Sequence, residues 1–181
     1  ARNMVFELLA ADQPERATCH DQTSKFWQWI DTMGVQPVSR LPRAERRPAA
    51  DSSHAAIAVN LDACINCGLC VRACREVQMN DVIGMAFRGA GARPVFDFAA
   101  DMGASTCVAC GECVQACPTG ALMEGNLLDA RGTRTVHSDR SVDTLCPFCG
   151  VGCQTRVHVK GEKIVAVDGR DGPANNNRLC V

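Results

Sequence analysis

The chain has 181 residues, a formal net charge of −1, and an aromatic content of only 4% with no tyrosine. The near-neutral charge argues against a nucleic-acid partner, which usually needs a basic face, and the lack of a run of about 20 apolar residues argues against a membrane span. With so few large side chains, a thin core is expected, and such domains usually depend on disulfides or metals.

The first 35 residues predict a helical segment. Apolar side chains recur at helical spacing over residues 4–9, and Pro14 stops this first helix. A second helix fits Lys25 to Met33, because a Thr or Ser N-cap precedes it and Gly34 follows it as a C-terminal stop. Residues 36–55 are rich in proline and charge, which is typical of a linker.

Residues 56–130 predict a small α+β domain with an internal repeat. Alternation, glycine turns and apolar runs indicate the following elements in order: a strand at 57–59, a helix at 68–77, a hairpin over 82–96, a helix at 112–116 and a strand at 121–123. Residues 131–181 predict a cysteine loop from Thr144 followed by a β-hairpin over 156–167 that turns at Gly161.

Twelve of the thirteen cysteines fall into three groups of four, which leaves Cys19 alone. The first two groups share the spacing C-x2-C-x2-C-x3-C, and the third has C-x2-C-x3-C-x26-C. In chain order the three groups are Cys64, Cys67, Cys70 and Cys74; then Cys107, Cys110, Cys113 and Cys117, with Pro118 next; then Cys146, Cys149, Cys153 and Cys180. Such close spacing favours convergence on metal centres over disulfides.

The repeated spacing is typical of two-cluster ferredoxins. Three cysteines of each run curl around one iron–sulfur cubane, and the fourth ligates the other cubane. We therefore predict two ligand sets: Cys64, Cys67, Cys70 and Cys117 for the first cluster, and Cys107, Cys110, Cys113 and Cys74 for the second. Zinc is the alternative, but zinc sites use paired C-x2-C knuckles that lie further apart.

Arg75 follows Cys74 where many ferredoxins have proline. Its charge either raises the potential of the neighbouring cluster or is simply solvated, and the second interpretation is favoured.

The third group resembles the N-terminal cluster motif of molybdopterin-dependent oxidoreductases. Cys146-Pro-Phe-Cys149-Gly-Val-Gly-Cys153 carries the resemblance, together with the hairpin, Asp168-Gly169 and the approach Asn177-Arg178-Leu179-Cys180-Val181. In detail it is similar to the catalytic subunit of formate dehydrogenase, and periplasmic nitrate reductase shares the cluster spacing. The order of the segments looks like that of the large subunit of NAD-dependent formate dehydrogenases: helices, linker, ferredoxin pair and then this module.

That resemblance implies a function. Formate would be oxidised at a molybdenum or tungsten bis-pterin centre in a downstream part of the same subunit. Electrons would then pass through three 4Fe–4S clusters to a flavin- and NAD-reducing iron–sulfur subunit. Within residues 1–181 the implied role is electron transfer alone, with no catalytic residue, and His54, His137 and His158 lack an evident carboxylate or nucleophile partner.

The chain departs from that family near its start. Many relatives ligate a further cluster there with one histidine and three cysteines, but Gln13 stands at the histidine position. The cysteine positions hold Ala17, His20 and Phe26. We therefore interpret Cys19 as an unligated thiol and His20 as an ordinary polar residue.

Two other readings remain open: a stand-alone polyferredoxin, and a segment of a complex I-like or hydrogenase subunit. The formate-dehydrogenase-like motif around Cys146 disfavours the second. The end of the sequence one residue after Cys180, with no initiator methionine at the other end, favours a piece of a longer protein over a polyferredoxin. The absence of a signal-like start and the use of reduced thiols predict a cytoplasmic location.

Overall fold

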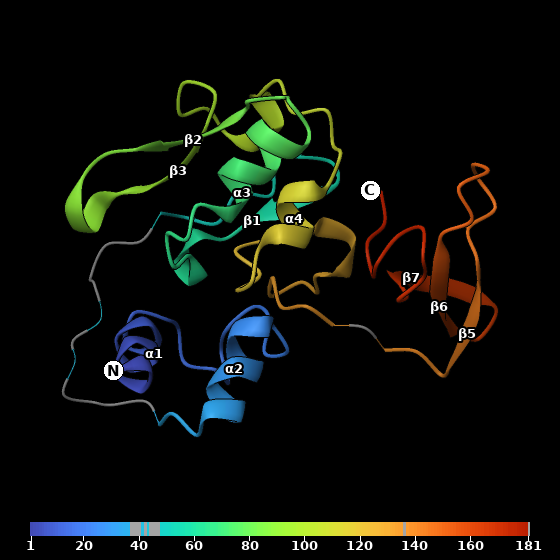
Figure 1. Cartoon of the computed structure of the whole chain (residues 1–181), viewed down its shortest axis with the longest axis horizontal. Coiled ribbons are helices and arrows are strands. Elements are labelled where there is room, and N and C mark those ends of the chain that lie inside the picture. The colour runs from blue at the N-terminus through green and yellow to red at the C-terminus, as the bar shows by residue number, and fades with distance from the viewer. Residues whose placement is uncertain (37–40, 42, 44–47, 136, 181) are drawn as a thin grey trace. The chain divides into compact units, whose positions relative to one another are not determined.

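A computed structural model describes residues 1–36, 41, 43, 48–135 and 137–180. It divides into two compact units, Ala1–Thr133 and Arg134–Val181, and each is described by itself. The first unit holds two small two-stranded sheets and the second a three-stranded sheet (Figure 1). Most of the predicted linker between residues 37 and 47, and the terminal Val181, lie outside the described residues.

The N-terminal segment is helical, as predicted. Helix α1 spans Arg2–Ala11 and helix α2 spans Lys25–Met33. Helix α2 ends at Gly34, which has a φ of 61°, so the predicted glycine stop is a left-handed C-cap. The two helices share a small apolar cluster centred on the fully buried Phe26, whose ring centroid lies 5.2 Å from that of Trp27.

Two short antiparallel sheets frame the ferredoxin-like part. Strand β1 (Ile57–Val59) pairs with β4 (Leu122–Glu124), so residues at the two ends of this part lie side by side. Strand β2 (Ile83–Ala86) pairs with β3 (Arg93–Phe96) in the predicted hairpin. Pairing β1 with β4 closes the part on itself and brings the loops that carry the two cysteine runs together.

Each cysteine run leads into a short helix. Helix α3 (Leu69–Arg72) continues as a π-helical turn η2 (Ala73–Val77), and helix α4 (Glu112–Ala116) follows the second run. Four 3-10 turns complete the unit: η1 (Leu61–Ala63), η3 (Gly89–Gly91), η4 (Met102–Ala104) and η5 (Gly125–Leu127). Helix α3 passes into η2 at Ala73, one residue before Cys74, and helix α4 ends at Ala116, directly before Cys117.

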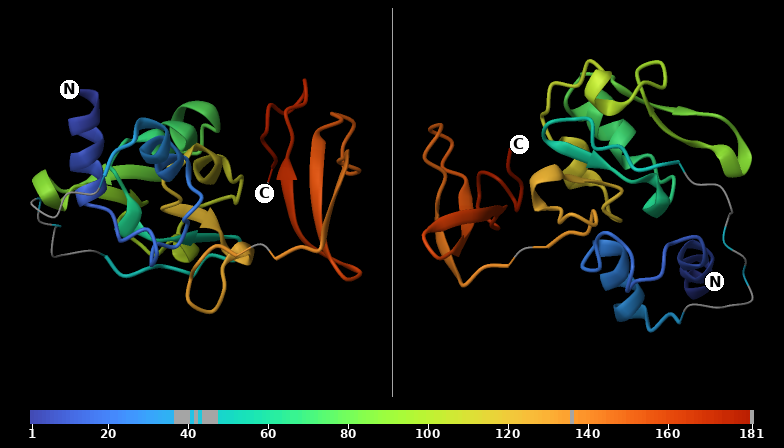
Figure 2. Two further views of the ribbon diagram at one scale, coloured as in Figure 1. Left: turned by 90° about the horizontal axis from the view of Figure 1, so that it is seen from below. Right: turned by 180° about the vertical axis from the view of Figure 1, so that it is seen from behind.

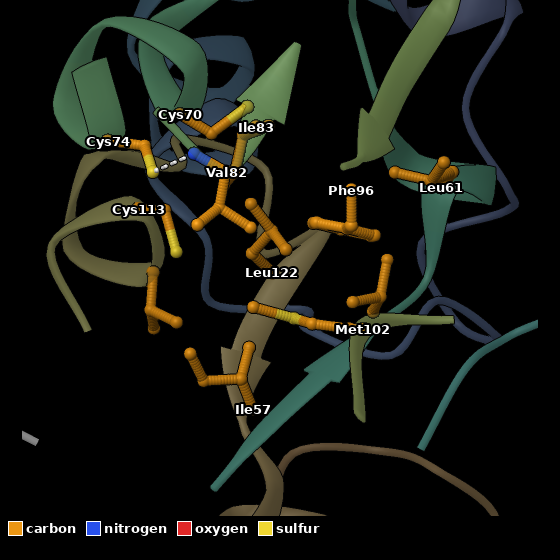
Figure 3. Close-up of a cluster of buried hydrophobic side chains, with 12 residues drawn as sticks. Ile57, Leu61, Cys70, Cys74, Val82, Ile83, Phe96, Met102, Cys113 and Leu122 are labelled. Carbon is orange, nitrogen blue, oxygen red and sulfur yellow. Dashed lines mark hydrogen bonds between the residues drawn. The ribbon is translucent and has the colours of Figure 1, made fainter. Parts of the chain in front are cut away.

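The main core of the first unit consists largely of medium-sized side chains and cysteines. Figure 3 shows Cys70, Cys74 and Cys113 among aliphatic residues such as Val82 and Leu122. Cysteine side chains therefore take the place that large side chains occupy in an ordinary core. This arrangement explains how the chain folds with so few aromatic residues.

The end of the predicted linker contacts the ferredoxin-like part. Asp51 forms an isolated bridge with Val59 through two backbone hydrogen bonds of 2.8 Å, and its Oδ2 accepts a bond of 2.7 Å from the Met102 amide. Gly103 lies so close to Ser53 that a Cβ there would stand 2.5 Å from the Ser53 carbonyl oxygen. Residues 51–53 therefore lie along this part of the unit.

The second unit is a three-stranded antiparallel sheet with the order β5-β6-β7 (Figure 2). Strands β6 (Gln154–Lys160) and β7 (Lys163–Gly169) form the predicted hairpin, and Gly161 turns it with a φ of 59°. Strand β5 (Arg140–Leu145) was not predicted, because all six of its residues are exposed and give no alternating pattern. Among the described residues, no helix is both long and apolar enough to cross a bilayer.

Candidate iron–sulfur cluster sites

The four cysteines predicted to bind the first cluster line one cavity. The cavity is bounded by the loop from Leu61 to Cys70, by Cys117 and by the start of β4. The four are Cys64, Cys67, Cys70 and Cys117. Two of the walls come from segments far apart in sequence, so the cavity depends on the pairing of β1 with β4.

The four cysteines predicted for the second cluster are also neighbours. Cys113 is buried, and its thiol interacts electrostatically with Cys107, Cys110 and Cys74, and with Cys70 of the first group. Cys70 and Cys74 lie one helical turn apart on the α3–η2 segment. That segment therefore contributes one cysteine to each of the two predicted ligand sets.

Burial controls the acidity of the innermost thiols. Removal from water, together with the charges of Cys117, Cys64 and Cys67, raises the pKa of Cys70 to about 12. Burial likewise raises the pKa of Cys113 to about 12, with contributions from the cysteines around it. Binding of iron as thiolates would require these protons to leave, and the positive charge of the iron would offset part of the thiolate charge.

The same backbone turn occurs in both cysteine runs. Asn66 and Gly68 have φ values of 54° and 73°, and Ala109 and Gly111 have values of 56° and 71°. In each run the first of these residues donates its amide to the first cysteine, as Asn66 N to Cys64 Sγ and Ala109 N to Cys107 Sγ, both at 3.4 Å. An amide directed at sulfur in this way favours negative charge on the thiolate.

A loop from Met79 to Val82 adds contacts to the second predicted ligand set, which consists of Cys74, Cys107, Cys110 and Cys113. The Val82 amide donates to Cys74 Sγ at 3.3 Å, drawn as the dashed line in Figure 3. The Asn80 side-chain amide donates to Cys110 Sγ at 3.8 Å.

The structure gives Arg75 a partner in the same loop. Its Nε lies 2.6 Å from Asp81 Oδ1, on the surface. Arg75 is therefore an exposed, ion-paired residue, and its effect on the potential of a neighbouring cluster stays a prediction.

A backbone hydrogen bond joins two cysteines of the third group. Cys146 N donates to Cys153 O at 2.8 Å, which closes the loop that carries Cys149. The approach to Cys180 is tied to the same place by Asn175, which is 8% exposed. Its Nδ2 donates to Gln154 O at 3.1 Å and to Arg178 O at 2.9 Å, and its Oδ1 accepts from Gln154 N at 3.0 Å. Sequence reasoning gave Asn175 no role.

Residues that stand where many relatives have the ligands of a further cluster form hydrogen bonds to the chain beside the first predicted ligand set. Gln13 is buried and donates Nε2 to the Ala63 carbonyl, next to Cys64, at 3.0 Å. His20 is buried and its Nε2 is hydrogen-bonded to the Gly120 carbonyl. The Phe26 amide bonds the Pro118 carbonyl at 2.9 Å. His20 is therefore a packed structural residue rather than an ordinary polar one.

Cys19 behaves as a protonated thiol. It is 3% exposed, and its Sγ donates to the Arg16 carbonyl at 3.1 Å. Burial raises its pKa, while hydrogen bonds from Trp27 and Asp21 only partly oppose that effect.

The expectation that His158 lacks a partner is wrong. Its Nδ1 lies 3.0 Å from Ser141 Oγ and its Nε2 lies 2.7 Å from Asp168 Oδ2. The three residues come from three adjacent strands, and the register of the unpredicted strand β5 sets Ser141 opposite His158. Arg156 and Asp143 form a second cross-strand pair on the same sheet at 2.8 Å. Pairs of this kind stabilise a sheet.

The donor set fits iron–sulfur clusters. Among the described residues, no group of three histidine, cysteine or acidic side chains is placed to hold a single metal ion. A cubane has a different requirement, because each of its four thiolates binds a separate iron atom around a larger body. Four thiols around one cavity and amides directed at sulfur meet that requirement.

Comparison with known proteins agrees with this chemistry. Residues 63–121 match the family model of the 4Fe-4S dicluster domain, and residues 139–181 match that of the molybdopterin oxidoreductase Fe4S4 domain.

Relatives in sequence cover most of the chain. "Putative formate dehydrogenase YrhE" from Bacillus subtilis is 30% identical over 83% of this chain and 19% of its own length. "Probable oxidoreductase YjgC" from the same organism is 28% identical over 72% and 17%. "Putative formate dehydrogenase SH0748" from Staphylococcus haemolyticus is 29% identical over 66% and 16%. The chain thus spans about a fifth of the length of these relatives.

Among solved structures, a chain of NAD+-reducing [NiFe]-hydrogenase in the H2-reduced state has the same fold. It matches with a TM-score of 0.58 and 22% identity, over 68% of this chain and 53% of its own length. The chain thus contains, in this order, a 4Fe-4S dicluster domain and a molybdopterin oxidoreductase Fe4S4 domain.

Proposed function

We propose that this chain is the electron-transfer segment of a formate dehydrogenase and that it holds three 4Fe–4S clusters. The observation that carries the proposal is the cavity lined by four cysteines from two distant segments, which a cubane needs and a packed core does not. The match of residues 139–181 to the molybdopterin oxidoreductase Fe4S4 domain supports the third cluster.

The proposed ligands form three sets. The sets are Cys64, Cys67, Cys70 and Cys117; Cys74, Cys107, Cys110 and Cys113; and Cys146, Cys149, Cys153 and Cys180. Electrostatic contacts among the first eight thiols, three of which are buried, support the first two sets. The hydrogen bonds of Asn175, which hold the approach to Cys180 against Gln154 beside Cys153, support the third.

Bound clusters would supply reversible one-electron transfer. The residues of the chain would supply thiolate ligands, amide hydrogen bonds to sulfur and a buried environment. Each of these tunes how readily a cluster accepts an electron.

Formate is the substrate we propose for the complete protein, because two of the relatives described above carry that activity in their names. Its oxidation would take place at a molybdenum or tungsten bis-pterin site in a further region of the same subunit. We also propose that the electron acceptor is a flavin-containing, NAD-reducing iron–sulfur subunit, because the order of helices, ferredoxin-like domain and Fe4S4 domain resembles that family. We further propose a cytoplasmic location.

Iron analysis of the anaerobically reconstituted chain tests the proposal. We expect about 12 iron atoms per chain (three clusters of four), with EPR signals of three 4Fe–4S centres on reduction. About 16 iron atoms would mean that the N-terminal segment also binds a cluster, and colourless or zinc-containing protein would refute the proposal altogether.

The substrate is tested in the longer polypeptide encoded by the same gene. Formate added under anaerobic conditions should reduce the clusters within the turnover time of the enzyme, while nitrate should not reoxidise them. Reoxidation by nitrate would favour a nitrate reductase.

A further inference from the structure

The two ferredoxin-type sites share one set of hydrogen bonds and differ in another. The shared bonds come from the repeated turns, where the amides of Asn66 and Ala109 each donate to the first cysteine of their run at 3.4 Å. Because the repeat supplies the same donor to both sites, this bond does not distinguish the two clusters. A difference must come from groups outside the cysteine runs.

Outside the runs, the two sites receive different donors. At the first site, the Thr119 hydroxyl lies 3.6 Å from Cys117 Sγ. At the second site, the Val82 amide lies 3.3 Å from Cys74 Sγ and the Asn80 side-chain amide lies 3.8 Å from Cys110 Sγ. The second site thus gains a side-chain amide that reaches a ligand 30 residues away in the sequence.

The backbone around Asn80 adopts an unfavourable conformation. Met79 and Asp81, on either side of it, have φ values of 58° and 53°. Residues with a side chain rarely occupy this left-handed region, and such strain is retained where the surrounding structure enforces it. Here Asn80 N donates to Cys74 O at 3.0 Å, and Asp81 pairs with Arg75 at 2.6 Å. These contacts hold the half-buried Asn80 side chain against Cys110.

Donors directed at a ligand sulfur change the energy of reduction. An added electron increases the negative charge on the cluster and its thiolates, so an N–H group stabilises the reduced state more than the oxidised state. We propose that Asn80 is a tuning residue that raises the reduction potential of the cluster bound by Cys74, Cys107, Cys110 and Cys113. The inference rests on the ligand sets of the proposed function and goes beyond them, since it gives the two clusters of the repeat unequal potentials.

EPR-monitored redox titration of the reconstituted 181-residue chain tests the inference with two variants. Asn80→Ala removes the donor, so the potential of the second cluster should shift to a more negative value. Asn80→Asp keeps the side-chain shape but replaces the N–H donor with a carboxylate, so the shift should be larger in the same direction. The potentials of the other two clusters should stay within error of the unmodified chain.

The matched control is Gln78→Glu, which adds the same charge two residues earlier at an exposed side chain. It should leave the second cluster nearly unchanged. The signal of that cluster is identified by its altered spectrum in Cys110→Ser, where a ligand changes from sulfur to oxygen.

If the unmodified chain binds about twelve iron atoms, three results would overturn the inference. The first is an unchanged potential in both Asn80 variants, and the second is an equal shift in Gln78→Glu. The third is failure of both variants to assemble the second cluster, which would make Asn80 a structural residue. Fewer than three clusters in the unmodified chain would instead refute the proposed function.

Discussion

At the scale of single residues, the proposed ligand thiols differ most in their burial. Cys70 and Cys113 lie in the core, and burial is the largest cause of their raised pKa values of about 12. Cys67 and Cys149 are exposed. A buried thiol with a raised pKa holds its proton at neutral pH, and iron binding must displace it. Protons therefore compete with iron most strongly at the innermost ligands.

This competition predicts acid-labile ferredoxin-type clusters. Since the pKa values of Cys70 and Cys113 are raised, both thiols bind a proton whenever iron leaves them, so lower pH favours loss. Between about pH 9 and about pH 6, removal of iron by a chelator should become faster as the pH falls. The measurement is the decay of cluster absorbance at fixed ionic strength and chelator excess. A rate that does not depend on pH would contradict the argument.

Some residue-scale features were predictable and others were not. The twelve ligand candidates were apparent because their spacing reflects the local curl of the chain around a cluster. Gln13 and His20 were not assigned their structural roles, because each makes its contact with a residue 50 or 100 positions away. Only folding of the N-terminal segment against the ferredoxin-like part produces those bonds.

At the scale of elements, predictions were most accurate where local chemistry marks the boundaries. Helix α2 begins and ends where its N-cap and Gly34 predict, and β1 and α4 have the predicted bounds. Strand β5 was missed, since its exposed residues lack alternation and its strand character comes from pairing with β6. The same pairing placed Ser141 beside His158, so the missed strand also hid that contact.

One element-scale contact, the Asn175 clamp, should control the third cluster. Cys180 lies 27 residues after Cys153, so a ligand this remote depends on the loop that returns it. Asn175 bonds both Gln154 and Arg178, and Gly169 allows that loop to approach, since a Cβ there would meet the Asn177 carbonyl oxygen at 2.7 Å.

We predict that Asn175→Asp makes the third cluster labile. The carboxylate loses both N–H donors and faces two carbonyl oxygens, which costs about 1–3 kcal/mol for buried groups left unpaired. Chelator should therefore remove the third cluster's EPR signal several-fold faster than in the unmodified chain, with the ferredoxin pair unaffected. Asn176→Asp, with the same change at an exposed neighbouring position, is the control and should behave as the unmodified chain. Equal lability in both variants would show a charge effect rather than a clamp.

At the scale of the whole molecule, the proposed ligand sets follow two different arrangements. In the first unit, a repeated run exchanges its fourth cysteine with its copy, so that α3 and η2 carry Cys70 for one proposed site and Cys74 for the other. In the second unit, the proposed ligands all lie between residues 146 and 180. Because each ferredoxin-type site takes one cysteine from the other run, the first two proposed clusters are coupled, whereas no proposed ligand is shared between the two units.

Two single-cysteine variants separate these arrangements. Cys180→Ala should retain about eight iron atoms and both ferredoxin-type signals, because only the third set loses a ligand. Cys117→Ala should lose the first cluster while the third signal stays intact, and the second cluster should weaken because its run no longer has an anchored partner.

Cys19→Ala is the control and should keep about 12 iron atoms, because its thiol already donates to Arg16 O and serves no proposed cluster. Iron analysis with EPR of each reduced variant gives the counts. If Cys117→Ala abolished the third signal, or Cys180→Ala a ferredoxin-type one, then ligands would have to cross between the units and the proposed sets would be wrong.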